Sequence, residues 1–402
     1  MTDASRKTRV AYLVTHPIQY QAPLLRLIAA QPDLDLAVFF QSDLSVKEYR
    51  DPGFGRVIKW DVDLLDGYHS EFLPALGRRD MLSALRPLSY GIGRRLWRGQ
   101  FDVLWVHGYA RWFNWVALCA ARRAGIPVLL RDEATPISAE RSAAKVWLKR
   151  TLMFRALDRL VAGFLAIGTL NRRYYEENSI VPARVFDLPY CVDNQYFASR
   201  AAAATPQREA LRARLGLEPG RPVILYASKL QARKRAGDLL AAFERLSRLV
   251  PRPYLVVIGD GEERATLEAR AAPLGGDVRF LGFLNQSELP AYFDLCDVFV
   301  LPSVQEPWGL IVNEVMNAGR AVVASDQVGC APDLVKDGVN GFVYPAGDAA
   351  ALADALRRVL TDRATVAAMG RASAAIIADW DFTRDLAGLR AAIAFAVGRS
   401  WP

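Results

Sequence analysis

The stretch Val298–Gly319, VFVLPSVQEPWGLIVNEVMNAG, decides how the rest of the chain is interpreted. Its first four residues, Val298–Leu301, form a short apolar run that is typical of a buried parallel strand. A polar turn follows, and we expect a helix to open near Trp308, because Pro307 suits the first turn of a helix. The N–H groups at the start of such a helix attract anions. The stretch therefore predicts an anion-binding site at the carboxyl end of a strand.

Two glutamates, Glu306 and Glu314, bracket the predicted helix start. A carboxylate cannot hold an anion, but it can accept hydrogen bonds from hydroxyl groups such as those of a sugar. Glu306 could instead only favour the helix dipole. Glu314 could lie on a solvated face, but its neighbours at helical spacing are Leu310, Ile311 and Ala318, and a carboxylate on an apolar flank needs a partner. An anion site beside two hydroxyl acceptors describes a sugar-nucleotide site.

The run E-P-W-G-L-I-V-N-E, with seven residues between its two glutamates, resembles the E-x7-E signature of retaining glycosyltransferases of family four. The resemblance is strong from Pro222 to about Leu360 and suggestive before residue 190. Members of that family adopt the GT-B fold, an α/β architecture of two Rossmann-like domains that face each other across a cleft. The resemblance implies a nucleotide-sugar site in the second domain and an acceptor site in the first.

The composition agrees with a chain of this class. With 402 residues, the chain is longer than a single hydrophobic core usually supports, so two domains are expected. A content of 52% hydrophobic and 23% charged residues is typical of a globular protein. The net charge of +8 suits anionic sugar nucleotides and a negatively charged membrane surface. No nucleic-acid-reading motif accompanies that charge, and we expect no nucleic-acid partner.

The cysteines and the N-terminus point to a cytoplasmic protein. The 4 cysteines are far apart and form no CxxC pair, which favours reduced thiols over metal ligands. The N-terminus lacks the apolar region of a secretory signal, and no run reaches the length of a transmembrane helix.

Strands and helices alternate regularly from Pro222 onward, which predicts a parallel sheet with right-handed crossovers. We expect residues 221–379 to form a C-terminal Rossmann-like donor domain and residues 1–190 to form an N-terminal Rossmann-like domain on the acceptor side. Residues 191–220 are interpreted as a hinge and linker. Residues 380–402 are expected to form a terminal helix that crosses back to the first domain.

Two lysines follow the first strand of the second domain. Lys229 and Lys234 match the paired cations of the family, usually Arg and Lys five apart, that neutralise the donor diphosphate. Lys in place of Arg at 229 keeps the charge and loses the bidentate fork. The pair would stabilise negative charge on the leaving diphosphate, which is the work a metal does elsewhere. The chain has no D-x-D signature at a plausible position, and its 3 histidines are far apart, so we expect no metal site.

Backbone groups and the two glutamates complete the predicted donor site. Gly259 follows another strand, where a small residue allows close backbone approach. The resemblance implies that the backbone of Gly282 and Phe283 contacts the base edge, that Glu306 accepts from the donor sugar, and that Glu314 accepts from the ribose diol. With the two lysines, Glu306 is also a predicted catalytic residue. The helix-start amides would come from Trp308, Gly309 and Leu310.

The first expected strand, Arg9–Val14, runs into the turn Thr-His-Pro-Ile-Gln-Tyr-Gln. This turn lies outside the carboxyl end of a strand, where open α/β sheets bind ligands. Many family members have a glycine-rich loop here, whereas this chain resembles a subgroup with His-Pro-Ile-Gln-Tyr. His16 is therefore either a ligand-binding residue or a buried, hydrogen-bonded histidine.

The catalytic candidates of the first domain follow two further strands. The strand Phe101–His107 ends at His107, and the strand Val128–Arg131 leads into Asp132 and Glu133. Family members commonly have a histidine at the second of these places, and here the acidic pair takes it, so all three side chains are candidates for the group near the reacting sugar. The alternative is a packed histidine with two solvated or capping carboxylates.

Two basic, apolar segments invite a membrane interpretation. Arg78–Arg98 is either a flap that faces the acceptor or the membrane, or an ordinary amphipathic surface. Residues 141–168 are either a basic amphipathic helix on anionic lipid or a domain helix with a cationic outer face.

The sequence thus predicts a metal-independent, retaining, hexosyltransferase-like enzyme in the cytoplasm, peripheral at the inner face of the membrane. It would move a sugar from a nucleotide-sugar donor to a glycan or lipid-linked acceptor in cell-surface polysaccharide or glycolipid synthesis. No cofactor is expected beyond the donor itself. The alternatives are a sugar-nucleotide hydrolase or epimerase on the same fold, and a catalytically silent subunit that binds the nucleotide sugar.

Overall fold

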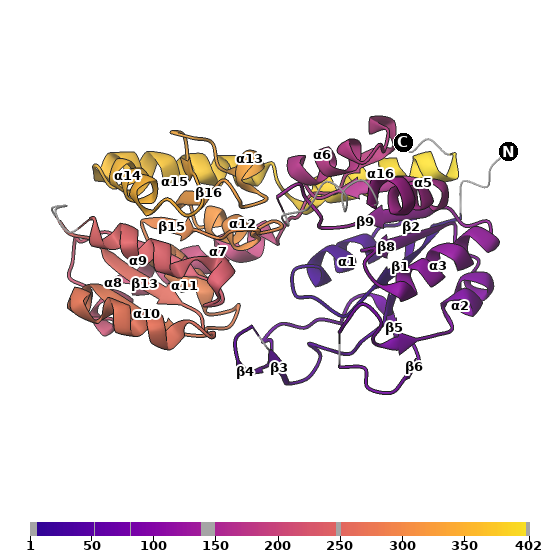
Figure 1. The fold of residues 1–402 in the computed structure, drawn as a ribbon, viewed down its shortest axis with the longest axis horizontal. Helices are drawn as coiled ribbons and strands as arrows, with labels where there is room; N and C mark the ends of the chain where they lie inside the picture. Colours follow the sequence, from indigo (N-terminus) through magenta and orange to yellow (C-terminus); the bar gives the residue numbers. More distant parts are fainter. Residues whose placement is uncertain (1–5, 52, 81, 138–148, 247–250, 399–402) are drawn as a thin grey trace. The chain divides into compact units, whose positions relative to one another are not determined.

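The computed structural model describes residues 6–51, 53–80, 82–137, 149–246 and 251–398 (Figure 1). The chain divides into two compact α/β units. Unit 1 takes Met1–Tyr49, Val62–Tyr190 and Phe382–Pro402, and unit 2 takes Arg50–Asp61 and Cys191–Asp381. The short segment Arg50–Asp61, which the sequence analysis placed in the first domain, therefore belongs to the second unit.

Among the described residues, unit 1 is built on a parallel sheet of seven strands in the order β11-β10-β9-β8-β1-β2-β5. The strands are β1 (Thr8–Val14), β2 (Leu34–Phe40), β5 (His69–Phe72), β8 (Val103–His107), β9 (Val128–Arg131), β10 (Gly163–Ala166) and β11 (Val185–Asp187). The helices are α1 (Ala22–Ala29), α2 (Ile92–Gly99), α3 (Trp112–Arg123), the π-helix η1 (Lys149–Phe154), α5 (Arg155–Leu160), α6 (Thr169–Glu177), the 3-10 helix η2 (Pro182–Arg184) and α16 (Phe382–Val397). Two short strands, β6 (Ala75–Leu76) and β7 (Leu88–Ser89), pair apart from the main sheet.

The unit 1 sheet is covered on both faces because its strands are apolar on both faces. Alternate residues of β1 point to opposite sides, so Ala11 and Leu13 join one hydrophobic cluster while Tyr12 and Val14 join another. Helices α2, α3, α5 and α6 contribute to the first cluster, and α1 and α16 to the second. Helix α16 packs tightly against β11: a Cβ at Gly388 would lie 1.6 Å from a backbone oxygen.

Among the described residues, unit 2 contains a parallel sheet of six strands in the order β14-β13-β12-β15-β16-β17. The strands are β12 (Val223–Ala227), β13 (Tyr254–Ile258), β14 (Val278–Gly282), β15 (Val298–Leu301), β16 (Ala321–Ser325) and β17 (Gly341–Tyr344), and β3 (Tyr49–Asp51) and β4 (Arg56–Ile58) form a separate two-stranded sheet. The helices are α7 (Asn194–Ala204), α8 (Arg208–Arg214), α9 (Ala236–Glu244), α10 (Arg264–Ala271), α11 (Leu289–Leu295), α12 (Ile311–Asn317), α13 (Ala331–Leu334), α14 (Ala349–Val359) and α15 (Arg363–Ala378), with 3-10 turns η3 (Thr205–Gln207), η4 (Ala232–Lys234) and η5 (Ala272–Asp277).

Several predicted elements differ from the structure. Helix α12 begins at Ile311, not near Trp308, and the residues before it form an irregular turn. The expected linker is largely helical: α7 and α8 occupy most of it, and the Asp193 side chain caps α7 by accepting from the backbone N–H of Tyr196 at 2.9 Å. The basic helix expected over residues 141–168 lies partly outside the described residues.

The strand registers bring functional loops together. In unit 2, Ala227 of β12 lies opposite Ile258 of β13, which in turn lies opposite Gly282 of β14. In unit 1, His107 of β8 lies opposite Arg131 of β9. The residues after these strand ends therefore share an edge of each sheet, which is where parallel α/β sheets bind ligands.

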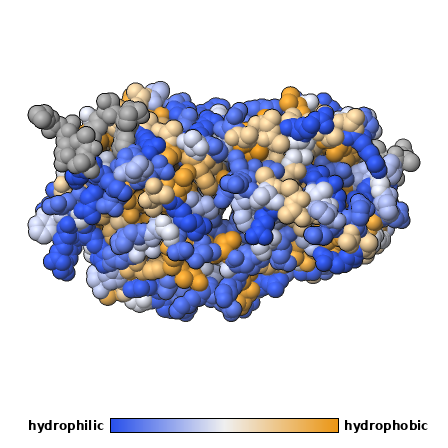
Figure 2. Space-filling view, turned by 180° about the vertical axis from the view of Figure 1, so that it is seen from behind, coloured by the Kyte–Doolittle hydropathy of each residue, from blue (hydrophilic) through white to orange (hydrophobic). Residues whose placement is uncertain are grey.

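None of the helices formed by the described residues has the length and apolar character needed to span a membrane. On the face shown in Figure 2, apolar residues are interrupted by hydrophilic ones.

Candidate functional site

The carboxyl edge of the unit 2 sheet is tightened by hydrogen bonds between its loops. The N–H of Gly259 donates to the carbonyl of Gly282 at 2.8 Å, and the N–H of Leu230 donates to the carbonyl of Asp260 at 2.8 Å. Gly259 has a φ of +133°, and a Cβ there would lie 1.9 Å from the carbonyl oxygen of Ser228. This position therefore requires glycine, as the sequence indicated, because the neighbouring loop leaves no room for a side chain.

Lys234 and Glu306 form a buried ion pair on this edge. They are 8% and 9% exposed, and Arg233 lies 4.0 Å from the same carboxylate. Burial lowers the pKa of Lys234, and the charge of Glu306 opposes that shift. The sequence predicts a diphosphate as the partner of the lysine and sugar hydroxyls as the partners of the glutamate. In the structure the two side chains contact each other.

Lys229 is paired as well. Its Nζ lies 2.8 and 3.0 Å from the two carboxylate oxygens of Asp51. Burial opposes the ionisation of Asp51, but the hydrogen bond and charge of Lys229 outweigh it and hold the pKa of Asp51 below its usual value. No local signal in the sequence singled out Asp51, which is 178 residues from its partner.

Glu314 differs from these paired groups. It is half-buried on α12, and no described residue donates a hydrogen bond to its carboxylate. Burial raises the pKa of Glu314 to about 8. A carboxyl group that is partly desolvated and lacks a protein donor is suited to accept hydrogen bonds from the hydroxyls of a ligand.

The turn before α12 contributes backbone rather than side chains. The Trp308 ring is buried, stacks on Trp380 with centroids 5.7 Å apart, and donates through Nε1 to Asn313 at 3.0 Å. Gly309 has a φ of +96°, and a Cβ there would lie 2.8 Å from Leu301. The backbone N–H groups of Gly309 and Leu310 donate to no described residue, which leaves them available to an anion.

Phe283, directly after β14, lies in an aromatic cluster with the Arg50–Asp61 segment. Its ring centroid is 4.8 Å from that of Phe54 and 6.3 Å from that of Trp60. Gly282 precedes it with a φ of +77°. The predicted base-edge position is therefore covered by residues that are distant in sequence.

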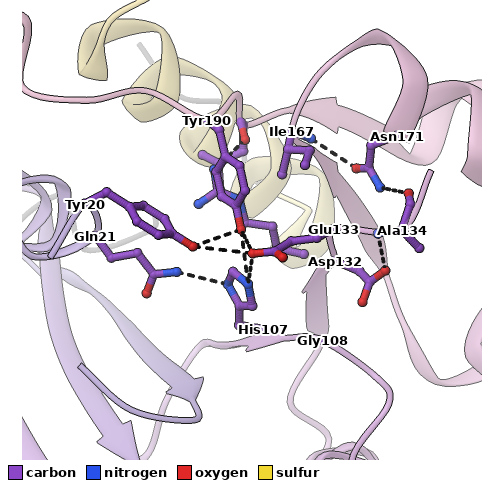
Figure 3. A network of polar contacts seen from close by, with 12 residues as sticks. Tyr20, Gln21, His107, Gly108, Asp132, Glu133, Ala134, Ile167, Asn171 and Tyr190 are labelled. Atoms are coloured by element: carbon purple, nitrogen blue, oxygen red, sulfur yellow. Dashed lines mark hydrogen bonds and ion pairs between the residues drawn. The ribbon is translucent and has the colours of Figure 1, made fainter. Parts of the chain in front are cut away.

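In unit 1, four polar side chains lie together at the edge formed by β1, β8 and β9 (Figure 3). We call His107, Glu133, Tyr20 and Tyr190 the Glu133 cluster. Tyr190 donates to the Glu133 carboxylate, and Tyr20 lies 3.4 Å from it. Nε2 of His107 is 3.7 Å from the same carboxylate. Behind the cluster, Arg131 places its guanidinium 4.4 Å from the centre of the Tyr190 ring.

Nδ1 of His107, the second ring nitrogen, also has hydrogen-bonding neighbours. Tyr12 Oη lies 3.1 Å from Nδ1, and Gln21 Nε2 lies 3.4 Å from it. Both partners come from β1 and the turn that follows it, so the imidazole is fixed by the neighbouring strand.

The Glu133 carboxylate is held in its ionised form. Desolvation by burial opposes ionisation, but hydrogen bonds and charge from His107, Tyr190 and Arg131 outweigh this and lower the pKa of Glu133 to about 2. Burial, together with the charge of Glu133, raises the pKa of Tyr20 and of Tyr190. The Glu133 side chain is still 43% exposed, so a ligand can reach it.

Asp132 is separate from the Glu133 cluster. Its carboxylate accepts from the backbone N–H of Ala134 at 2.7 Å, and Asn171 donates to the carbonyl of Ala134 at 2.7 Å (Figure 3). Burial raises the pKa of Asp132, and the Ala134 hydrogen bond opposes that shift. The sequence analysis grouped Asp132 with Glu133, but in the structure the first carboxylate caps the turn and only the second meets His107.

His16 lies at the start of the turn that follows β1, close to the cluster. Burial, with help from the charges of Arg111 and His107, lowers the pKa of His16 to about 4, so its ring is neutral at pH 7. Its Nδ1 is buried and has no hydrogen-bond partner among the described residues. The hydrogen-bonded histidine considered from the sequence is thus not seen at this nitrogen.

Sequence reasoning did not single out Tyr20, Gln21 or Tyr190 as site residues. The first two belong to the His-Pro-Ile-Gln-Tyr-Gln turn whose histidine was noted, so that motif could have indicated them. Tyr190 ends the Val62–Tyr190 segment of unit 1, far in sequence from the other members of the cluster, and only the folded unit brings it to Glu133.

Comparison with known proteins places the chain in a family. Residues 207–375 match the family model for glycosyl transferases group 1. The chain is 30% identical over 305 residues to 2-deoxystreptamine glucosyltransferase of Streptomyces kanamyceticus, and the alignment covers 74% of this chain and 77% of that protein. The chain belongs to the group 1 glycosyltransferases.

Further relatives differ in how much they cover. Alpha-D-kanosaminyltransferase, also of Streptomyces kanamyceticus, is 32% identical, but that alignment spans only 51% of this chain and 52% of the relative. The crystal structure of Anabaena Alr3699/HepE in complex with UDP matches with a TM-score of 0.71 at 19% identity, over 95% of this chain and 98% of that one. At that identity the match speaks for the fold, which is the two-domain GT-B fold.

Proposed function

We propose that this group 1 glycosyltransferase is retaining and metal-independent, and that it moves a hexose from a nucleotide sugar to a glycan or lipid-linked acceptor. The observation that carries the proposal is Glu314, a half-buried carboxyl group that accepts a hydrogen bond from none of the described residues. The N–H groups of Gly309 and Leu310, which have no acceptor in the described part of the chain, precede it by about one helical turn. A hydroxyl acceptor beside an anion-binding turn matches the two chemistries of a sugar nucleotide.

The lysines supply the positive charge for the leaving diphosphate. Lys229 is 31% exposed and can exchange its carboxylate partner for a phosphate, whereas Lys234 is buried with Glu306 and contributes a fixed, partly neutralised charge. Fixed charge near a leaving group stabilises the transition state more than the ground state. These groups do the work that a bound metal does in other transferases.

The Glu133 cluster is assigned to the acceptor side. With a pKa of about 2, Glu133 is ionised at every pH near neutrality and is a weak proton acceptor. Its role is then to orient an acceptor hydroxyl or to stabilise positive charge on the reacting sugar, while the leaving phosphate takes the acceptor proton. Such front-face chemistry retains the anomeric configuration and needs no strong base in the protein.

The donor is proposed to be a uridine nucleotide, supported by the UDP in the Anabaena neighbour. A screen of nucleotide sugars for an increase in melting temperature tests this, because a ligand that binds only the native state stabilises it. Transfer with the best donor, followed by NMR of the product anomer, tests retention, and turnover in excess EDTA tests metal independence. Release of free sugar with no transfer to any acceptor would instead identify a hydrolase.

Membrane contact and a role in surface glycan or glycolipid synthesis at the inner membrane face are also proposed. The segment between β6 and the end of α2 exposes Leu85 and Trp97 at 65% and 74%, and exposed arginines lie among them. Apolar tips within a cationic surface suit anionic lipid. Flotation with vesicles of phosphatidylglycerol tests the contact, and a Trp97→Ala variant that floats equally well would refute it.

A further inference from the structure

The Arg50–Asp61 segment covers the residues that the proposed function assigns to the nucleotide. It joins unit 2 although Tyr49 and Val62, on either side of it, belong to unit 1. Asn285 fixes its far end by donating to the carbonyl of Lys59 at 2.7 Å, and Arg56 lies 3.7 Å from Asp260.

The Asp51 carboxylate pairs with Lys229, the cation that the proposed function assigns to the donor diphosphate. Its carboxylate accepts from Lys229 and from the backbone N–H groups of Gly53 and Phe54 at 2.7 and 3.0 Å. The absence of a side chain at Gly53 allows this approach: a Cβ there would lie 2.6 Å from Cδ of Lys229. The carboxylate is therefore aimed at the lysine by its own turn.

The Phe54 ring lies beside Phe283, where the base of the nucleotide is expected. Its centroid is 4.8 Å from that of Phe283, and Nζ of Lys229 lies 4.7 Å from the Phe54 centroid. The segment thus places a carboxylate on Lys229, which the proposed function gives to a diphosphate, and an aromatic ring on Phe283, where the base is expected. A nucleoside diphosphate carries the same pair of chemistries.

We propose that Arg50–Asp61 is an internal competitor of the nucleotide. Asp51 holds Lys229 in place of the diphosphate, and Phe54 holds Phe283 in place of the base. The inference rests on the proposed function, which gives Lys229 to the donor diphosphate, and on the expected place of the base beside Phe283. Because the nucleotide binds only after the segment has left, its apparent affinity is reduced by the fraction of molecules in which the segment is released.

Calorimetric titration of the full chain with UDP and with uridine tests both contacts. Asp51→Asn should bind UDP about fivefold more tightly than the parent, the size of a partly exposed ion pair, and should bind uridine more tightly as well, because both ligands bind only after the segment has left. Phe54→Ala should tighten the binding of both ligands. In a Lys229→Met background, Asp51→Asn should give no gain, because the cation for which the two anions compete is gone.

A matched control removes the same charge elsewhere. Asp35 forms an exposed ion pair with Arg9 in unit 1, so Asp35→Asn should leave UDP affinity unchanged. Equal UDP affinity in the parent, Asp51→Asn and Phe54→Ala would overturn the competitor while leaving the proposed donor site intact. Weaker UDP binding by both variants would also overturn it and would show that the segment lines the nucleotide site. Absence of UDP, GDP and ADP binding by every variant would overturn the proposed function and the competitor together.

Discussion

Replacing Glu314 by Gln should stabilise the ligand-free protein at high pH and weaken donor binding. Burial raises the pKa of Glu314 to about 8, above the 4.5 of an unperturbed glutamate. Below pH 4.5 the group is neutral in both folded and unfolded chains, so it does not affect stability. As pH rises from 4.5 to about 8 the unfolded chain ionises first, and stability falls until the folded carboxyl group is ionised as well.

The size of the effect follows from the shift. One pKa unit corresponds to about 1.4 kcal/mol, so complete burial would cost about 5 kcal/mol above pH 8. Glu314 is only half-buried, and screening by water reduces this to about 1–2 kcal/mol. For a unit of this size that equals about 2–8 °C in melting temperature.

The assay is thermal unfolding of parent and Glu314→Gln at pH 5, 7.5 and 9, with donor affinity measured by calorimetry at pH 9, where the Glu314 carboxyl group is ionised. The difference in melting temperature should grow with pH, while the variant loses about tenfold in donor affinity, since one charge-assisted hydrogen bond is weakened. Glu209→Gln, at an exposed glutamate of α8, is the matched control and should do neither. A melting difference that is the same at pH 5 and pH 9, or unchanged donor affinity, would refute the reasoning.

Three further outcomes are expected. Lys229→Met and Lys234→Met should lower kcat more than donor affinity, because the charge on the diphosphate grows towards the transition state. Steady-state kinetics and calorimetry measure the two effects, and an effect on affinity alone would contradict the assignment. Glu133→Gln should abolish transfer and leave nucleotide affinity unchanged, and full transfer by this variant would refute the acceptor role of Glu133. Asp132→Asn should mainly lower the melting temperature, because it weakens the hydrogen bond from the backbone N–H of Ala134. Gly259→Ala should destabilise unit 2 by about 2 kcal/mol or more, because its Cβ would meet a carbonyl at 1.9 Å, and an unchanged urea midpoint would disprove that packing.

Local pattern predicted the strands and a parallel sheet, whereas the GT-B fold was implied by the family resemblance. The β-branched and apolar runs at Val128–Arg131, Tyr254–Ile258 and Val298–Leu301 became strands β9, β13 and β15 with the same bounds, because a strand buried on both faces needs a continuous apolar run. The start of α12 was wrong by three residues. Gly309 takes a left-handed φ and packs against Leu301, so the chain turns before the helix can begin.

Local pattern also located the two sheet edges that carry the candidate site, since strand ends are visible in the sequence. It could not predict the partners of the side chains found there. The Lys229–Asp51 pair spans 178 residues, the Lys234–Glu306 pair spans 72, and Tyr190 reaches Glu133 across 57. Spacing identified these residue types, but ion pairing and pKa depend on distances through space. Those distances were decided only when segments far apart in the chain packed together in the folded protein.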